Sequence, residues 1–317
     1  MYDIVSLGEL LIDFTESGLS PAGMRLFEQN PGGAVTNLLC AASQCGAKTG
    51  FIGKVGRDMH GAFLKQAMLD AGVDMHALVE AEDVFTTLAF VALKPSGERE
   101  FSFARKPGAD TQLRPDELER DMLRSTRVFH TGSLSLTQEP CRAATYEAID
   151  IAKAAGAVIS YDPNYRATLW GGEAEAVRFM RSLIATADIM KVSDEELPLL
   201  TGETDPEKAA DVLLDQGVTI VAVTLGSNGA YIRVGSESRY VAGFRANAVD
   251  TTGAGDSFFG GFLYRFLSSD KALRAVGADD AADYARFGNA TASLCVERRG
   301  GIPSMPKLAE VLERLNQ

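Results

Sequence analysis

The sequence predicts an α/β fold, a three-layer α/β/α sandwich around a mainly parallel sheet, and two observations support it. Short apolar runs rich in β-branched residues recur along the chain, at 3–7, 127–134, 157–162, 187–193 and 219–225. Amphipathic segments with helical spacing separate most of these runs, and each ends at Gly, a frequent helix stop: 60–72, 141–156 and 206–217. Strands that alternate with helices form parallel sheets covered on both faces, and ligands bind beyond their carboxyl ends.

Two stretches break this alternation and predict a small second sheet. They lie at about 14–31 and 86–104, and the second alternates apolar and polar residues around a Pro-Ser-Gly turn at 95–97. Such alternation is typical of a half-exposed antiparallel hairpin. We therefore expect a single domain over 1–317 with a small β-sheet lid from these stretches. The apolar face of the lid needs a cover, which predicts a homodimer joined lid to lid.

Composition limits the partners of the chain. A net charge of -12 argues against a nucleic-acid partner, since duplex binding needs clustered Lys and Arg. No apolar run approaches the roughly 20 residues that cross a membrane. The start of the chain lacks a basic leader and a cleavage site, so we expect a cytoplasmic protein. Its 4 cysteines are scattered, which predicts buried reduced thiols, and its 3 histidines are too dispersed for a His-rich metal site.

The most informative stretch is a glycine-rich turn that runs into a long apolar helical segment at 248–267. Gly253, Ala254 and Gly255 have little or no side chain, so their N–H groups can approach a phosphate at a helix N-terminus. Asp256 would follow in the first helical turn, where it could accept a proton from an attacking hydroxyl. The alternative is a capping carboxylate after a simple turn.

The run DTTGAGDSFFGGFL that holds this turn resembles, at every position, the second signature of the ribokinase-like (PfkB) carbohydrate kinases. The resemblance implies a ribokinase-like fold and an ATP-dependent sugar kinase. It also implies that Asp256 is the catalytic base and that Gly253, Ala254 and Gly255 form the anion hole. The enzyme would take a small sugar and Mg²⁺ with ATP.

The resemblance covers nearly the whole chain, and FHTGSLSLTQEPCRAAT at 129–145 is most similar to bacterial and plant fructokinases. It implies transfer from ATP to D-fructose, giving fructose 6-phosphate. The alternatives are a 2-keto-3-deoxygluconate kinase and a ribose or nucleoside kinase. A dinucleotide oxidoreductase would need a G-x-G-x-x-G turn after the first strand, and GELLID has none. A non-catalytic sugar sensor would typically have lost the base or the glycines, and both are present.

Candidate sugar ligands lie in the N-terminal half. Asp13 ends a probable strand, and Gly32 and Gly33 precede a helix that carries Asn37. A carboxylate and an amide could bind sugar hydroxyls, or they could only cap a helix and shape a loop. The glycines and Asn37 resemble the first family signature, which contacts the sugar. Val35 departs from the Pro or small residue that is usual there.

Two arginines complete the sugar side. The lid run ends in Arg105, whose planar fork suits neighbouring oxygens of a polyol. The run SYDPNYRATLW resembles the fructokinase segment in which Arg166 faces the substrate pocket. Ala104 and Tyr165 depart from the usual aromatic and Leu at their positions.

The nucleotide half begins at ADIMKVSDEEL, where the family pattern Asn-x-x-Glu positions hydrated Mg²⁺ and phosphate. Ser193 replaces the Asn, and Glu196 carries over as the Mg²⁺ residue, acting through water. The nucleotide contacts implied by the resemblance are Lys191, Ser193, Thr224, Gly226, Gly229, Asn289 and Ser293. In many relatives the segment 297–304, with the region of Asp250 and Thr252, binds a monovalent cation. The corresponding expected potassium residues are Asp250, Thr252, Arg298, Gly300 and Ser304.

Overall fold

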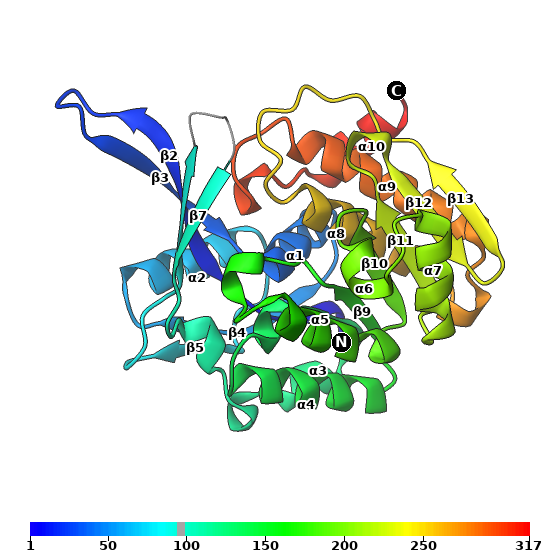
Figure 1. The fold of residues 1–317 in the computed structure, drawn as a ribbon, viewed down its shortest axis with the longest axis horizontal. Coiled ribbons are helices and arrows are strands. Elements are labelled where there is room, and N and C mark those ends of the chain that lie inside the picture. The colour runs from blue at the N-terminus through cyan, green and yellow to red at the C-terminus, as the bar shows by residue number, and fades with distance from the viewer. Residues whose placement is uncertain (94–98) are drawn as a thin grey trace.

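A computed structural model describes residues 1–93 and 99–317, and a large sheet runs through its centre (Figure 1). The order of its nine strands is β13-β12-β11-β10-β9-β8-β1-β4-β5. All neighbours from β5 to β11 are parallel, and β12 and β13 extend the sheet as antiparallel strands. The strands are β1 (Tyr2–Leu7), β4 (Thr49–Gly56), β5 (Leu78–Ala81), β8 (Thr126–Gly132), β9 (Val158–Asp162), β10 (Ile189–Ser193), β11 (Ile220–Thr224), β12 (Ala230–Val234) and β13 (Glu237–Val241).

Helices cover both faces of this sheet, as the predicted three-layer sandwich requires. The α-helices are α1 (Ala34–Gln44), α2 (Met59–Asp70), α3 (Arg120–Arg124), α4 (Cys141–Ala154), α5 (Glu173–Ser182), α6 (Leu197–Thr201), α7 (Pro206–Asp215), α8 (Ala254–Ser268), α9 (Ala278–Cys295) and α10 (Leu308–Leu315). Successive strand residues point to opposite faces, so Ile4 joins the core cluster under α1 and α8, and Val5 joins the one under α4. The predicted α/β fold is confirmed.

A smaller sheet of four strands, ordered β3-β2-β6-β7, projects from the main body (Figure 1). Its strands are β2 (Leu11–Leu19), β3 (Arg25–Gly32), β6 (Leu88–Leu93) and β7 (Arg99–Ala104). The two hairpins β2–β3 and β6–β7 are antiparallel as expected, but the central pair β2–β6 is parallel. Both inner strands start at the main body and run outward, so they point the same way. The predicted turn at 95–97 lies outside the described residues.

The carboxyl ends of the parallel strands meet at one edge of the main sheet, and the connections to the small sheet leave from the same edge. The turn after β1 leads directly into β2, and β3 leads through Gly33 into α1. The four cysteines are buried and carry free thiols. Of the helices in the described residues, none combines the length and apolarity needed to cross a membrane.

Candidate active site

The glycine turn and the first turn of α8 form a set of backbone donors at the edge of the main sheet. Gly253 precedes α8 with φ 78°, a left-handed conformation that favours glycine. The Ser257 N–H closes the first helical bond to the Gly253 oxygen at 2.7 Å. The N–H groups of Gly255 and Asp256 lie between these residues, where a helix has no internal acceptors for its donors. This arrangement can bind an anion.

Asp256 is the third residue of α8 and is half-buried beside the turn. Its Oδ2 accepts a hydrogen bond from Asn37 Nδ2 at 2.8 Å. Burial raises the pKa of Asp256 above its usual value, although the Asn37 bond and the charges of Lys191 and Arg166 act in the opposite direction. A carboxylate with a raised pKa is a better proton acceptor, which suits a general base.

Lys191 supplies a positive charge beneath the turn. Its Nζ lies 2.9 Å from Asp162 Oδ2, and both side chains are buried. A Cβ on Gly255 would lie 3.0 Å from that Nζ, so the glycine leaves the ammonium close to the helix start. Burial alone would lower the pKa of Lys191, but Asp162 and Glu196 outweigh it and the pKa is raised. Lys191 therefore stays charged at neutral pH.

Glu196 is buried at the start of α6, and its carboxylate is held by the protein. Oε1 accepts the Tyr165 N–H at 2.7 Å, and Oε2 accepts both the N–H and the hydroxyl of Ser193 at 2.9 Å. No three His, Cys, Asp or Glu side chains of the described chain lie close enough together to hold a metal. With both oxygens held by protein donors, the Glu196 carboxylate could contact a Mg²⁺ ion through water ligands. We call Asp162, Lys191, Glu196 and Asp256 the base cluster.

The glycine pair before α1 brings the sugar-side residues close together. A Cβ on Gly32 would fall 2.3 Å from Asp13 Oδ2, and one on Gly33, which has φ 129°, would fall 2.3 Å from the Glu9 carbonyl oxygen. Only glycine fits both positions. Val35, the departure from the family pattern, is fully buried and packs on Gly8, so the larger side chain fills core space.

Arg166 and Arg105 differ in how the protein engages them. Arg166 is exposed at the start of the short helix Ala167–Leu169, donates to the Tyr165 carbonyl at 2.9 Å and acts electrostatically on Asp256. Arg105 is 4% exposed, and all three of its nitrogens donate to protein oxygens. Their acceptors are Asp110 Oδ2, Thr137 Oγ1 and the Leu134 carbonyl oxygen, at 2.8, 2.9 and 3.0 Å.

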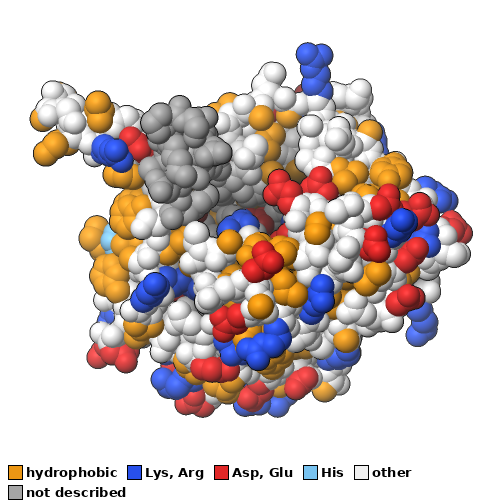
Figure 2. All heavy atoms as spheres, viewed as in Figure 1, with side chains coloured by type: hydrophobic (Ala, Val, Ile, Leu, Met, Phe, Trp, Pro, Cys, Tyr) orange, Lys and Arg blue, Asp and Glu red, His pale blue; other side chains and the backbone are white. Residues whose placement is uncertain are grey.

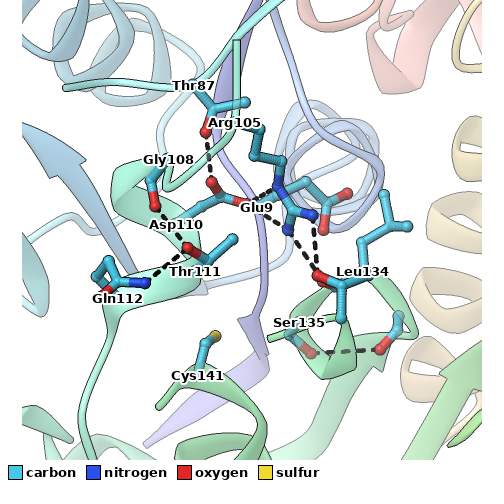
Figure 3. A network of polar contacts seen from close by, with 12 residues as sticks. Glu9, Thr87, Arg105, Gly108, Asp110, Thr111, Gln112, Leu134, Ser135 and Cys141 are labelled. Atoms are coloured by element: carbon cyan, nitrogen blue, oxygen red, sulfur yellow. Dashed lines mark hydrogen bonds and ion pairs between the residues drawn. The ribbon is translucent and has the colours of Figure 1, made fainter. Parts of the chain in front are cut away.

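Figure 3 shows the buried network around Arg105. Asp110 also accepts the Thr87 hydroxyl, and Glu9 lies beside the guanidinium. We call Glu9, Thr87, Arg105 and Asp110 the seat cluster, because it lies where the small sheet joins the main body. In the structure Asp110, Thr137 and Leu134 accept hydrogen bonds from the three nitrogens of the Arg105 fork. The contact of this fork with sugar oxygens stays a prediction.

The strand-to-turn segment on the nucleotide side has the predicted glycines in left-handed conformations. Gly226 has φ 56° and Gly229 has φ 100°, and a Cβ on Gly229 would lie 2.1 Å from the Val241 oxygen. Thr224 ends β11 and donates weakly to the Val192 carbonyl at 3.5 Å. Because Gly229 has no side chain, the backbone of the turn at 226–229 can pack closely against the backbone at 241–243, at the end of β13 and just after it.

The two predicted adenine residues on α9 have different surroundings. Asn289 is buried and donates to the carbonyls of Val241 and Ala242 at 3.1 Å, so it orders the segment beside the nucleotide turn. Ser293 donates to the Ala290 carbonyl and accepts from Arg314 of α10 at 2.9 Å. The Ser293 hydroxyl thus joins α9 to α10, and its contact with the nucleotide stays a prediction.

The predicted potassium residues come together in part. Asp250 Oδ1 accepts the N–H and hydroxyl of Thr252, and its Oδ2 accepts the Gly300 N–H at 3.1 Å. The Ser304 hydroxyl donates to the Gly301 carbonyl at 2.7 Å. The Arg298 side chain is paired with Glu310, so from this residue only main-chain atoms could serve as a ligand.

The comparisons with known proteins fit this geometry. The pattern described as "pfkB family carbohydrate kinase" matches residues 1–308. The chain belongs to the pfkB family. The predicted carbohydrate kinase class is confirmed by this match.

Two of its most similar curated relatives are plant enzymes. The chain is 43% identical over 314 residues to "Probable fructokinase-4" of Arabidopsis thaliana, which covers 97% of this chain and 95% of the relative. It is 41% identical over 317 residues to "Fructokinase-2" of Solanum lycopersicum, which covers 98% of this chain and 95% of the relative. The predicted resemblance to the fructokinase branch of the pfkB family is therefore confirmed.

Two bacterial structures share the fold. The fructokinase of Xylella fastidiosa with bound ATP superimposes with a TM-score of 0.92 at 32% identity, covering 100% of this chain and 99% of that one. The fructokinase of Vibrio cholerae O395 with fructose, ADP and calcium ion has a TM-score of 0.89 at 30% identity, covering 99% of both chains.

Sequence reasoning missed three carboxylates of this pfkB protein. Asp162, Glu9 and Asp110 were not among the predicted site residues. Each is buried beside a cation in the folded chain. For Glu9 a signal was present, because an acid in the middle of the apolar run SLGELLI is unusual unless it has a partner.

Proposed function

We propose that this protein is an ATP-dependent fructokinase that converts D-fructose and ATP to fructose 6-phosphate and ADP. The observation that carries the proposal is the Asp256 carboxylate, which is bonded to Asn37 at 2.8 Å and lies beside the glycine turn and Lys191. The names of the curated relatives and the fructose and ADP bound by the Vibrio cholerae enzyme support the choice of substrate.

In the proposed reaction the sugar hydroxyl attacks the γ-phosphorus of ATP. Asp256 takes the hydroxyl proton, the new O–P bond forms, and the bond from the γ-phosphorus to the bridging oxygen breaks, which releases ADP. The predicted anion hole at 253–255 would act chiefly through the turn's free N–H groups, those of Gly255 and Asp256, because the Ala254 N–H donates to the Thr251 carbonyl. Together with the Lys191 ammonium they would stabilise negative charge on the transferring group. Asp13 and Asn37 would hold sugar hydroxyls, and Arg166 is exposed on the same side.

Mg²⁺ would arrive with ATP and neutralise charge on its phosphates. We propose that Glu196 would bind the water ligands of this Mg²⁺ ion and so contact the metal indirectly. Thr224, Gly226 and Gly229 would cradle the nucleotide, with Asn289 ordering the neighbouring segment. The segments around Asp250 and Gly300 would hold potassium. A cytoplasmic location suits both the ATP substrate and the free thiols.

The small sheet is proposed to act as the lid of a single kinase domain and as the contact between two copies. Exposed apolar residues lie toward the far end of its β2–β3 hairpin, at Leu19, Met24, Leu26 and Phe27. Figure 2 shows hydrophobic side chains among polar ones on this projecting part. Phe14 stacks on Phe90 with ring centroids 5.3 Å apart, and Phe27 packs edge-on against Phe90. A second lid could cover these rings. A monomer mass at micromolar concentration would contradict this contact.

A 2-keto-3-deoxygluconate kinase is the second candidate, and exposed Arg166 favours it, because a guanidinium binds a carboxylate well.

The test of the proposed function is ADP release from Mg-ATP with fructose, ketodeoxygluconate, ribose, glucose and an aminoimidazole riboside. We expect the highest kcat/KM with fructose. A preference for ketodeoxygluconate would replace fructose by the second candidate, and ADP release that no sugar stimulates would refute the kinase proposal. Product analysis by ³¹P NMR would distinguish phosphorylation at O6 from O1.

A further inference from the structure

Glu9 is a buried carboxylate that the proposed reaction does not use. It lies in the turn between β1 and β2 and is 2% exposed. Its Oε1 accepts the Ala34 N–H at 2.7 Å, and its Oε2 has no hydrogen-bond partner among the described residues. A buried acid with one unsatisfied oxygen costs free energy, so its position needs a physical explanation.

The peptide group that Glu9 holds is the first of α1. Gly33, just before it, has no side chain that could cap the helix. Glu9 supplies the missing acceptor from a distant part of the sequence, at the positive end of the helix dipole. The Glu9 carbonyl also lies against Gly33. Both the side chain and the main chain of Glu9 therefore fix the start of α1.

The first turn of α1 leads from this contact to the base. The Asn37 N–H bonds to the Gly33 carbonyl at 2.8 Å, and Asn37 Nδ2 donates to Asp256 at 2.8 Å. A helical turn moves as a unit, so a displacement at Ala34 would carry Asn37 with it. The Asn37 bond also lowers the pKa of Asp256 against the effect of burial.

On its other side Glu9 faces the seat of the small sheet (Figure 3). Arg105 directly follows β7, and the Asp110 carboxylate accepts the hydroxyl of Thr87, which directly precedes β6. In the described chain the groups that act electrostatically on Glu9 are Arg105, Asp110 and the Cys141 thiol. Burial raises the pKa of Glu9 to about 7, the Ala34 bond and Arg105 lower it, and Asp110 raises it.

We propose that Glu9 is a positioning residue that couples the seat of the small sheet to the catalytic base. It holds the first turn of α1 so that Asn37 keeps Asp256 oriented and ionised. A shift of the small sheet would move Arg105 and change the charge beside Glu9. The contact of Glu9 with the first turn of α1 would then change, and with it the position of Asn37 against Asp256. This inference rests on the proposed kinase function of the site.

A double-mutant cycle on Glu9 and Asn37 tests the path. Glu9→Ala and Asn37→Ala should each lower kcat by about tenfold or more, since small misplacements of reacting groups carry such costs. Together they should cost little more than the larger single loss, because Glu9 acts through Asn37. Multiplicative losses in kcat would overturn the inference. Glu9→Gln keeps an acceptor for the Ala34 N–H and should lose less kcat than Glu9→Ala; equal losses in both would also contradict the role of this bond.

A second readout does not depend on turnover. The pKa of Asp256, followed by ¹³C NMR of its carboxyl carbon, should rise in Glu9→Ala and rise less in Glu9→Gln. The matched control is Glu117→Ala on the short helix Pro115–Glu117, which removes a carboxylate that accepts hydrogen bonds from the Arg114 N–H and the Lys54 ammonium. It should reduce stability and leave the Asp256 pKa unchanged. An unchanged pKa in both Glu9 variants would overturn the inference, whereas a wild-type enzyme inactive on every sugar would refute only the proposed function.

Discussion

The first turn of α1 touches two buried charge clusters that use similar residues to different effect. The base cluster has one cation, Lys191, which is paired with Asp162 at 2.9 Å, and its Asp256 is only half-buried. The seat cluster also has one cation, Arg105, but three protein acceptors engage it and its carboxylates face no solvent. The solvent access of Asp256 suits the first cluster for contact with a ligand, and the engagement of Arg105 by three protein acceptors suits the second for support.

The largest effect should come from the base cluster. Asp256→Asn removes the proposed proton acceptor and keeps an oxygen for Asn37, so we expect kcat to fall by roughly 10²–10⁴-fold. ADP release with saturating sugar measures it. The control is Asp283→Asn on the surface of α9, where the carboxylate is paired with Arg265. Turnover near the wild-type rate in Asp256→Asn would contradict the role of the base and with it the proposed chemistry of this cluster.

The thermal stability of Asp256→Asn, unlike its kcat, should not fall. The pKa of Asp256 is higher in the folded protein than in the unfolded chain. The folded protein therefore loses stability as the pH rises from the unfolded-state pKa through the folded-state pKa, because Asp256 then ionises where it is buried. At neutral pH Asp256→Asn should therefore melt no lower than the wild type. At a pH below both pKa values this difference should disappear.

The next effect tests the seat cluster. Arg105→Leu leaves Asp110 as a buried charge without its cation, and such losses cost about 3–5 kcal/mol of unfolding free energy. Urea unfolding followed by circular dichroism measures it. Because a well-packed apolar pair can replace a buried ion pair, the double variant Arg105→Leu with Asp110→Leu should recover part of the loss. A single variant as stable as the wild type would show that the cluster gives no support.

The two clusters also differ in how far the sequence could predict them. The turn at 253–256 is a local pattern, and the alternation of strands and helices indicated the main sheet. The bond from Asn37 to Asp256 joins residues 219 positions apart, and that from Arg105 to Thr137 spans 32. Such contacts depend on how the two sheets meet. For this reason Arg105 was predicted at the sugar without its protein partners, and Glu9 was missed.

A moderate effect should follow from Arg166, which has fewer protein acceptors than Arg105. Arg166 is exposed and lies within electrostatic reach of Asp256, so Arg166→Ala should raise KM for the sugar roughly tenfold, as expected for one lost charged hydrogen bond. Its unfolding free energy should stay within about 0.5 kcal/mol of wild type. The comparison with Arg105→Leu then separates ligand binding from support. An unchanged KM for every sugar would remove Arg166 from the substrate side.

The smallest effect concerns a cation near the anion hole. Asp250 joins Thr252, at the start of the glycine turn, to Gly300 on the neighbouring loop. A potassium ion bound by these segments would stiffen the turn before Gly253 without contacting the sugar. We therefore expect kcat to rise severalfold when potassium replaces sodium in ammonium-free buffer, with KM for the sugar nearly constant. Equal rates with the two cations would contradict the site, and Asp250→Asn should abolish the difference if the site is real.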